Sequence, residues 1–67
     1  MTGKFTPREL QVIELILQEK SSSAIADELH ISERTVETYR KSIYSKATVR
    51  SVVGLVKHVY EHNLFNH

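Results

Sequence analysis

Basic side chains are concentrated in the middle of the chain, between residues 33 and 50. The whole chain has a formal net charge of only +1, but this segment holds five basic residues against Glu33 and Glu37. A concentrated positive charge suits contact with phosphate groups, so a nucleic acid is the ligand that these residue types favour. An ordinary solvated face is the alternative interpretation. The five basic residues are Arg34, Arg40, Lys41, Lys46 and Arg50.

Two histidines have a spacing at which metal chemistry is possible. His58 and His62 stand four residues apart, so two imidazoles on one helix face can share a zinc ion. A zinc site needs a third or fourth ligand, but Glu61 points elsewhere around the helix and His67 lies in the C-terminal tail. We therefore expect surface histidines, with no metal, no other cofactor and no small-molecule ligand.

Catalytic chemistry has no group of residues to support it. The chain has no cysteine, no Gly-rich phosphate loop, and no serine with a His–acid pair at a meaningful spacing. We therefore expect no catalytic residue and a protein that is not an enzyme. The lack of cysteine, of a signal peptide and of an apolar run long enough to span a bilayer favours a cytoplasmic location without a membrane partner.

Helices must position these residues, and the first helix has the clearest start. Thr6 can accept the backbone N–H of Glu9 while the Glu9 carboxylate accepts that of Thr6, which is a capping box. Pro7 suits the first helical turn. We predict a helix over residues 7–19, with Phe5 packed against its start. Its apolar stripe is Leu10, Ile13, Ile16 and Leu17.

Two further helices are predicted over residues 22–29 and 33–47, separated by a short turn. The hydroxyl cluster at residues 21–23 favours a helix start. His30 follows the second helix at a point where a left-handed residue would end it, and histidine tolerates a positive φ better than most residues. Ile31 can fill the corner, and Ser32 can cap the third helix.

A fourth helix is predicted over residues 51–63, and Leu64 and Phe65 are expected to fold back onto the core. One apolar stripe on this helix includes core positions, among Val52, Leu55, Val56 and Val59. The fold class is therefore all-α, a four-helix bundle-like domain over residues 6–65. We expect residues 1–5 to be a disordered or expression-derived N-terminus.

The second and third helices, joined by so short a turn, predict a helix-turn-helix. The major groove of DNA admits one α-helix, and side chains from the N-terminal half of that helix read the base edges. Helix 22–29 is short and carries Asp27 and Glu28, whereas helix 33–47 is long and basic. We therefore predict that helix 33–47 reads the DNA.

Taken together, motifs in all four helices resemble the LuxR-type helix-turn-helix, also called the GerE or NarL/FixJ type. This resemblance implies a four-helix output domain, usually at the C-terminus of a bacterial transcription regulator such as a two-component response regulator. It implies binding to double-stranded DNA as a homodimer and contact with RNA polymerase as a further partner. The matching residues are Thr6-Pro7-Arg8-Glu9, Ser21 through Ile25-Ala26-Asp27-Glu28-Leu29, Ile31-Ser32-Glu33-Arg34-Thr35-Val36-Glu37-Thr38-Tyr39, Ile43 and Lys46.

The resemblance also implies roles for particular residues. By position in the family pattern, Glu37, Thr38 and Lys41 are expected to contact bases, with Arg40 nearby. Phosphate contacts fall to Ser32, Arg34, Thr35, Tyr39 and Lys46. The dimer interface falls to Val53, Lys57 and Tyr60 on the fourth helix. Core packing for Tyr39 and helix capping for Thr35 are the alternatives.

The chain departs from the family pattern at four positions. Glu19 and His30 stand where glycine is common, Ala24 where an acidic residue is common, and Glu37 where lysine is common. Two interpretations of Glu37 stay open: it accepts a hydrogen bond from a cytosine N4 amine, or it pairs with Lys41 on the rim of the helix. Two other functions also stay open, namely region 4 of a sigma factor and a helical protein-interaction module without DNA binding.

Overall fold

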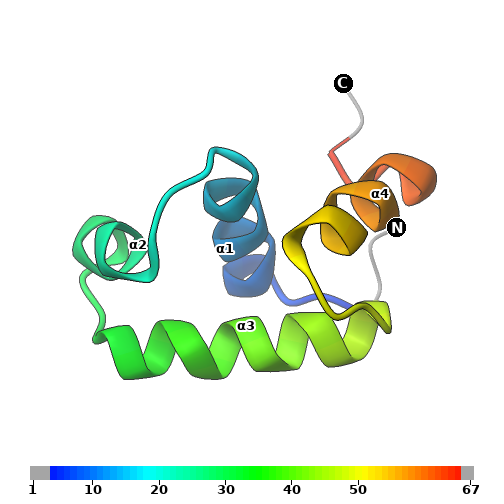
Figure 1. The fold of residues 1–67 in the computed structure, drawn as a ribbon. Coiled ribbons are helices and arrows are strands. Elements are labelled where there is room, and N and C mark those ends of the chain that lie inside the picture. The colour runs from blue at the N-terminus through cyan, green and yellow to red at the C-terminus, as the bar shows by residue number, and fades with distance from the viewer. Residues whose placement is uncertain (1–3, 66–67) are drawn as a thin grey trace.

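The computed structural model describes residues 4–65, and within them it contains four α-helices and no strand. These are α1 (Pro7–Leu17), α2 (Ser22–Leu29), α3 (Glu33–Ala47) and α4 (Val52–His62). Figure 1 shows that α3 runs beneath the other three helices, with α1 in the middle and α2 and α4 at opposite ends. Both α2 and α4 pack against α1 and α3. The predicted all-α class and the order of the four helices are confirmed.

Each helix begins at a hydroxyl residue with extended backbone, whose side chain accepts the N–H of the third helical residue. The N–H donors are those of Glu9, Ala24, Thr35 and Gly54, at 3.1 to 3.2 Å. These bonds satisfy amides that have no partner inside the helix. The predicted capping box at α1 is present, because Thr6 N–H also donates to Glu9 Oε1 at 2.8 Å. The four capping residues are Thr6, Ser21, Ser32 and Ser51.

Each helix is followed by a left-handed residue that is not glycine: Glu19 (φ 64°), His30 (φ 59°), Thr48 (φ 57°) and Asn63 (φ 50°). In each case the next residue donates its N–H to a carbonyl five positions earlier, which is the Schellman arrangement. The prediction of a left-handed residue at His30 is confirmed.

Two predicted helix boundaries need correction. The first helix was predicted over residues 7–19, but α1 ends at Leu17 because Glu19 turns to a positive φ and donates its N–H to the Ile16 carbonyl at 2.8 Å. The fourth helix was predicted over residues 51–63, but Ser51 and Asn63 are the residues that flank α4 at its two ends. Capping residues have non-helical backbone, so they lie just outside the helix.

The core is formed by apolar side chains from all four helices. Six of them are fully buried, namely Val12, Ile13, Ile25, Val36, Ile43 and Leu55. Ile31, Leu64 and Phe65 are half-buried and pack against this core, as predicted. Phe5 is also buried and Lys4 donates to the Lys46 carbonyl at 2.8 Å, so the folded domain includes both residues although the sequence suggested a boundary after residue 5. Within residues 4–65, no helix is both long and apolar enough to cross a membrane.

Candidate nucleic-acid interface

The turn between α2 and α3 holds the two helices in a fixed relation. His30 N–H donates to the Asp27 carbonyl, and Ile31 N–H donates to the Ala26 carbonyl at 3.0 Å. Ile31 packs on the core, and Ser32 begins α3 directly afterwards. Val36 and Ile43 are fully buried on the side of α3 that faces the domain. The opposite side of α3 is therefore turned away from the core.

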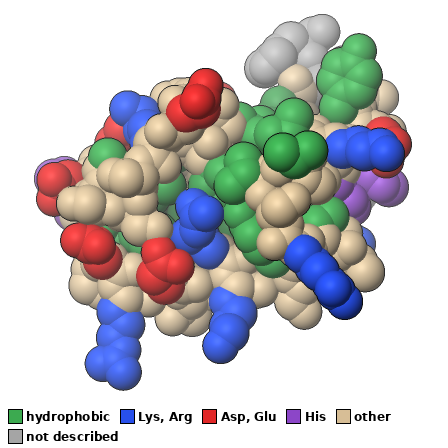
Figure 2. All heavy atoms as spheres, viewed as in Figure 1, with side chains coloured by type: hydrophobic (Ala, Val, Ile, Leu, Met, Phe, Trp, Pro, Cys, Tyr) green, Lys and Arg blue, Asp and Glu red, His purple; other side chains and the backbone are tan. Residues whose placement is uncertain are grey.

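This opposite side carries four exposed polar side chains, which we call the outer face of α3: Arg34, Glu37, Thr38 and Lys41. They line one shallow hollow of about 350 Å³. Figure 2 shows Lys and Arg side chains projecting outward from the edge of the molecule along which α3 lies. The structure thus brings three of the four predicted base-contact residues together with Arg34, a predicted phosphate contact.

Within the outer face, Glu37 has a partner that the sequence did not reveal. The Ser22 hydroxyl, at the first position of α2, donates to Glu37 Oε2. The ion pairs among the described residues are Lys20–Glu28 and Lys46–Glu9, so in this structure Glu37 is bonded to Ser22 and not paired with Lys41. The other interpretation of Glu37, a hydrogen bond from a cytosine amine, stays a prediction. Thr38 donates its hydroxyl to the Arg34 carbonyl at 3.1 Å, which leaves its methyl group free to contact a base.

Arg40 differs from the other predicted base-contact residues. It is half-buried, is absent from the lining of the hollow, and donates to the Tyr44 hydroxyl at 3.3 Å, with its guanidinium 5.7 Å from the Tyr44 ring centroid. Tyr44 therefore holds Arg40 on the flank of α3. Sequence reasoning missed Tyr44, although the spacing of four residues between a cation and an aromatic ring on one helix signals such a contact. Tyr39 is half-buried and packs against the core.

The N-terminus of α3 presents two hydroxyl groups. Ser32 Oγ and Thr35 Oγ1 lie 2.9 Å apart, both residues are exposed, and Ser32 also accepts the Thr35 N–H. The capping role considered for Thr35 at the sequence level thus belongs to Ser32. Amides and hydroxyls at a helix N-terminus suit a negatively charged oxygen. Phosphate contact by Ser32 and Thr35 stays a prediction that this geometry allows.

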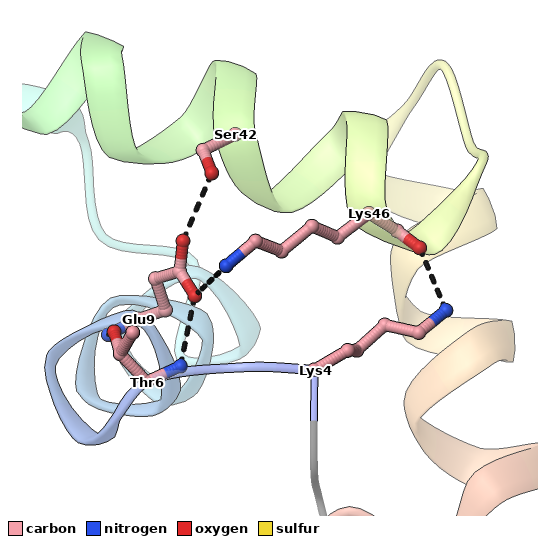
Figure 3. Close-up of polar contacts among 5 residues, drawn as sticks. All are labelled: Lys4, Thr6, Glu9, Ser42 and Lys46. Carbon is pink, nitrogen blue, oxygen red and sulfur yellow. Dashed lines mark hydrogen bonds and ion pairs between the residues drawn. The ribbon is translucent and has the colours of Figure 1, made fainter.

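Lys46, a predicted phosphate contact, lies in a polar cluster that joins α1 to α3 (Figure 3). Its ammonium donates to Glu9 Oε1 at 2.7 Å, and Ser42 donates to Glu9 Oε2 at 2.9 Å. The Glu9 side chain is only 6% exposed. Burial alone would raise the pKa of Glu9, but the donors Lys46, Thr6 N–H and Ser42, together with the charge of Lys46, outweigh burial and lower the pKa below its ordinary value. Much of the positive charge of Lys46 is therefore compensated within the protein.

The predicted dimer residues lie on an open apolar surface between α1 and α4. Val53 is 78% exposed and Tyr60 is 84% exposed. With Lys57 they line a groove of about 560 Å³, whose apolar side chains gather over α1 and α4 in Figure 2. On the predicted core stripe of α4, Leu55 and Val59 are buried, whereas Val52 and Val56 open onto this groove. The remaining lining residues are Ile16 and Leu17 of α1 and Glu19, which follows this helix.

His58 and His62 form a stacked aromatic pair. Their ring centroids are 4.3 Å apart, and Phe5 lies edge-on to His58 at 6.2 Å. Burial lowers the pKa of His58, and the nearby His62 and Lys4 lower it further, against a smaller opposing effect of Glu61. Among residues 4–65, no three His, Cys, Asp or Glu side chains are grouped as metal ligands would be.

The fold and the outer face of α3 define a helix-turn-helix domain, and comparison with known proteins names its family. Residues 3–59 match the model of the bacterial regulatory proteins of the luxR family. The chain is 34% identical over 59 residues to the transcriptional regulatory protein MctR of Rhizobium johnstonii, covering 88% of this chain and 28% of that protein. It is 39% identical over 55 residues to the uncharacterized response regulatory protein YgeK of Escherichia coli, covering 82% and 37% respectively.

A third relative is the putative positive transcription regulator of virulence factors BvgA of Bordetella pertussis. It is 37% identical over 57 residues, which cover 85% of this chain and 27% of that protein. The chain spans about 30% of the length of the first three relatives. No solved structure matches the chain significantly.

The chain therefore belongs to the LuxR family of bacterial regulatory proteins, and its helix-turn-helix is a DNA-binding domain of transcription regulators. This result decides between the predicted LuxR-type domain and region 4 of a sigma factor in favour of the former.

Proposed function

We propose that this domain recognises a specific sequence in double-stranded DNA by placing the outer face of α3 in the major groove. The observation that carries the proposal is that α3 has one buried apolar side and one exposed polar side. Val36 and Ile43 are fully buried on the first side. The second side carries four exposed residues around one hollow, namely Arg34, Glu37, Thr38 and Lys41. A helix of this diameter fits the major groove, and these four side chains lie in its N-terminal two-thirds.

In this arrangement the outer face divides into two kinds of contact. Glu37, Thr38 and Lys41 contact base edges, and Arg40 does so only if it leaves Tyr44. Ser32, Arg34 and Thr35 contact phosphates at the start of α3, where the helix dipole also favours negative charge. Tyr39 contributes through its hydroxyl from the edge of the core. Lys46 adds a weaker phosphate contact, because Glu9 already compensates its charge.

The α1–α4 groove supports a homodimer on DNA. Val53 and Tyr60 are large, exposed and apolar, and they flank a groove that a second copy of α4 would cover. Exposed apolar patches of this kind mark interaction sites. Lys57 lies at the rim of the same surface, where a charged side chain can remain solvated.

We infer that the domain serves as the output module of a two-component response regulator in the bacterial cytoplasm. The support is the family match together with relatives named as transcriptional and response regulatory proteins. The domain binds and does not catalyse, and RNA polymerase is a further proposed partner of the DNA-bound dimer.

The test is selection of bound sequences from a random duplex DNA pool at moderate salt. The wild-type chain is expected to enrich a two-fold-related motif, and Lys41→Ala to lose part of it. Lys20→Ala is the matched control, because it removes the same charge from a side chain that pairs with Glu28 and does not line the hollow on α3. If the folded wild-type domain enriches no motif, the proposal is wrong.

A further inference from the structure

One polar contact on the interface remains unexplained by the fold or by the proposed DNA contacts. Ser22 is half-buried at the first turn of α2, and its hydroxyl donates to Oε2 of the exposed Glu37. Among residues 4–65, no other side-chain hydrogen bond joins α2 to α3. The core does not need this contact, because Ile25 of α2 and Val36 of α3 are fully buried beneath it.

The contact restricts how Glu37 meets a ligand. A glutamate on a helix surface normally samples several rotamers of its long side chain, and this freedom is lost on binding. Ser22 donates to one carboxylate oxygen, so this contact favours one orientation of the other oxygen, Oε1, before DNA arrives. The Glu37 side chain lines the same hollow as Arg34, Thr38 and Lys41.

The chemistry of a carboxylate then limits the base that it can accept. An ionised carboxylate only accepts hydrogen bonds, and the donors in the major groove are the cytosine N4 and adenine N6 amines. Adenine also has an N6 amine, but its N7 acceptor lies beside this amine, and the N7 lone pair repels a carboxylate. Guanine and thymine present acceptors only. Cytosine is thus the base that fits a fixed Glu37.

We propose that Ser22 is a positioning residue that orients Glu37 to accept from a cytosine amine, so that α2 and α3 together determine one base of the recognised sequence. This inference rests on the proposed function. Arg34 and Lys41, one turn before and one turn after Glu37, offset the repulsion between its carboxylate and the DNA phosphates.

The experiment measures the base preference at the position that depends on Glu37. After selection from a random duplex pool, Kd is measured for the best duplex and for the three duplexes that differ at that base pair. The wild-type chain is expected to prefer cytosine by about 10-fold, within the usual cost of one mismatched base pair. Glu37→Gln should shift the preference toward adenine, because an amide can bond both N6 and N7 of that base.

Ser22→Ala should reduce the cytosine preference to about 2- to 3-fold, with preferences at other positions unchanged. Ser22→Thr, which keeps the hydroxyl, should restore the preference. Ser23→Ala is the matched control, because Ser23 is the exposed neighbour and no hydrogen bond joins it to Glu37. Circular dichroism melting of each variant separates a loss of positioning from a loss of folding, since unfolding would weaken binding to all duplexes equally.

Two outcomes would overturn the inference, and they differ from failure of the proposed function. One is a wild-type motif in which no position responds to Glu37→Gln. The other is a cytosine preference that survives Ser22→Ala intact. A wild-type chain that enriches no motif would instead overturn the proposed function, and the inference with it.

Discussion

Lys46 donates to the carboxylate of Glu9, with 2.7 Å between Nζ and Oε1, across a sequence separation of 37 residues. The contact ties the last turn of α3, the helix with the exposed outer face, to the first turn of α1. Glu9 also accepts from Thr6 and Ser42, so both of its oxygens are satisfied although its side chain is almost fully buried. The Glu9 carboxylate therefore bridges the two helices.

We expect Glu9→Gln to lower the free energy of unfolding by about 2 kcal/mol. Breaking a buried ion pair costs about 3–5 kcal/mol, and the partial exposure of Lys46 reduces this cost. Urea denaturation followed by circular dichroism at low temperature measures the change. Glu14→Gln, at an exposed position of the same helix, is the control and should change stability by less than about 0.5 kcal/mol. A similar small effect in Glu9→Gln would contradict a structural role.

The stacked histidines predict that stability falls as the medium becomes acidic. The pKa of His58 is lowered in the folded state, so from about pH 6.5 downward the unfolded chain takes up a proton that folded His58 does not. The stability contributed by neutral His58 is therefore complete above its unfolded pKa and is lost as the pH falls toward the folded pKa. His58→Gln should flatten this part of the curve of melting temperature against pH.

Arg34 and Lys46 should differ in how they affect the salt dependence of DNA binding. Removing one phosphate contact reduces the slope of log K against log salt by about 0.9. We expect this full reduction for Arg34→Ala, whose side chain is exposed, and less than about half of it for Lys46→Met, whose charge is paired with Glu9. Binding titrations at several salt concentrations measure both slopes. Equal reductions would show that Lys46 leaves Glu9 to contact the DNA.

The groove between α1 and α4 predicts a class of variants that fold but do not assemble. Val53→Asp and Tyr60→Asp place a charge on an exposed apolar surface, so the melting temperature should stay within a few degrees of the wild-type value. Affinity for a two-fold-related site should fall by at least 10-fold, whereas affinity for a single half-site should stay unchanged. Glu61→Ala, exposed on the same helix but outside the groove, is the control. Sedimentation on duplexes with one or two half-sites gives the stoichiometry.

Thr48 is the left-handed residue after α3, and its branched side chain is poorly suited to that backbone. Thr48→Gly should raise stability by about 0.5–1 kcal/mol, because the relief of strain exceeds the extra freedom that glycine has in the unfolded chain. Ser45→Gly, inside α3, should lower stability by about 0.5 kcal/mol. Thermal denaturation of both variants checks the opposite signs. A loss of stability in both would show that Thr48 is not strained.

Local rules predicted much of this fold, and non-local contacts account for what they missed. The Thr6–Glu9 capping box, the left-handed His30 and the Ser32 cap each involve residues a few positions apart, and all three are present. The end of α1 was placed too late because nothing about Glu19 as a residue type announces a positive φ. The pairing of Lys46 with Glu9 depends on the crossing of two helices, as does that of Glu37 with Ser22.

The caps at both ends of α3 bear on how tightly DNA can be bound. Ser32 holds an amide at the start of this helix, and at its end the N–H groups of Thr48 and Val49 and the Lys4 ammonium hold the carbonyls of Ser45, Tyr44 and Lys46. Ordering a backbone during association costs about 1–2 kcal/mol per residue in conformational entropy. All fifteen residues of α3 are ordered beforehand, so this cost is not subtracted from the free energy of binding. Affinity and sequence preference then depend on side-chain contacts and on how readily the DNA itself deforms.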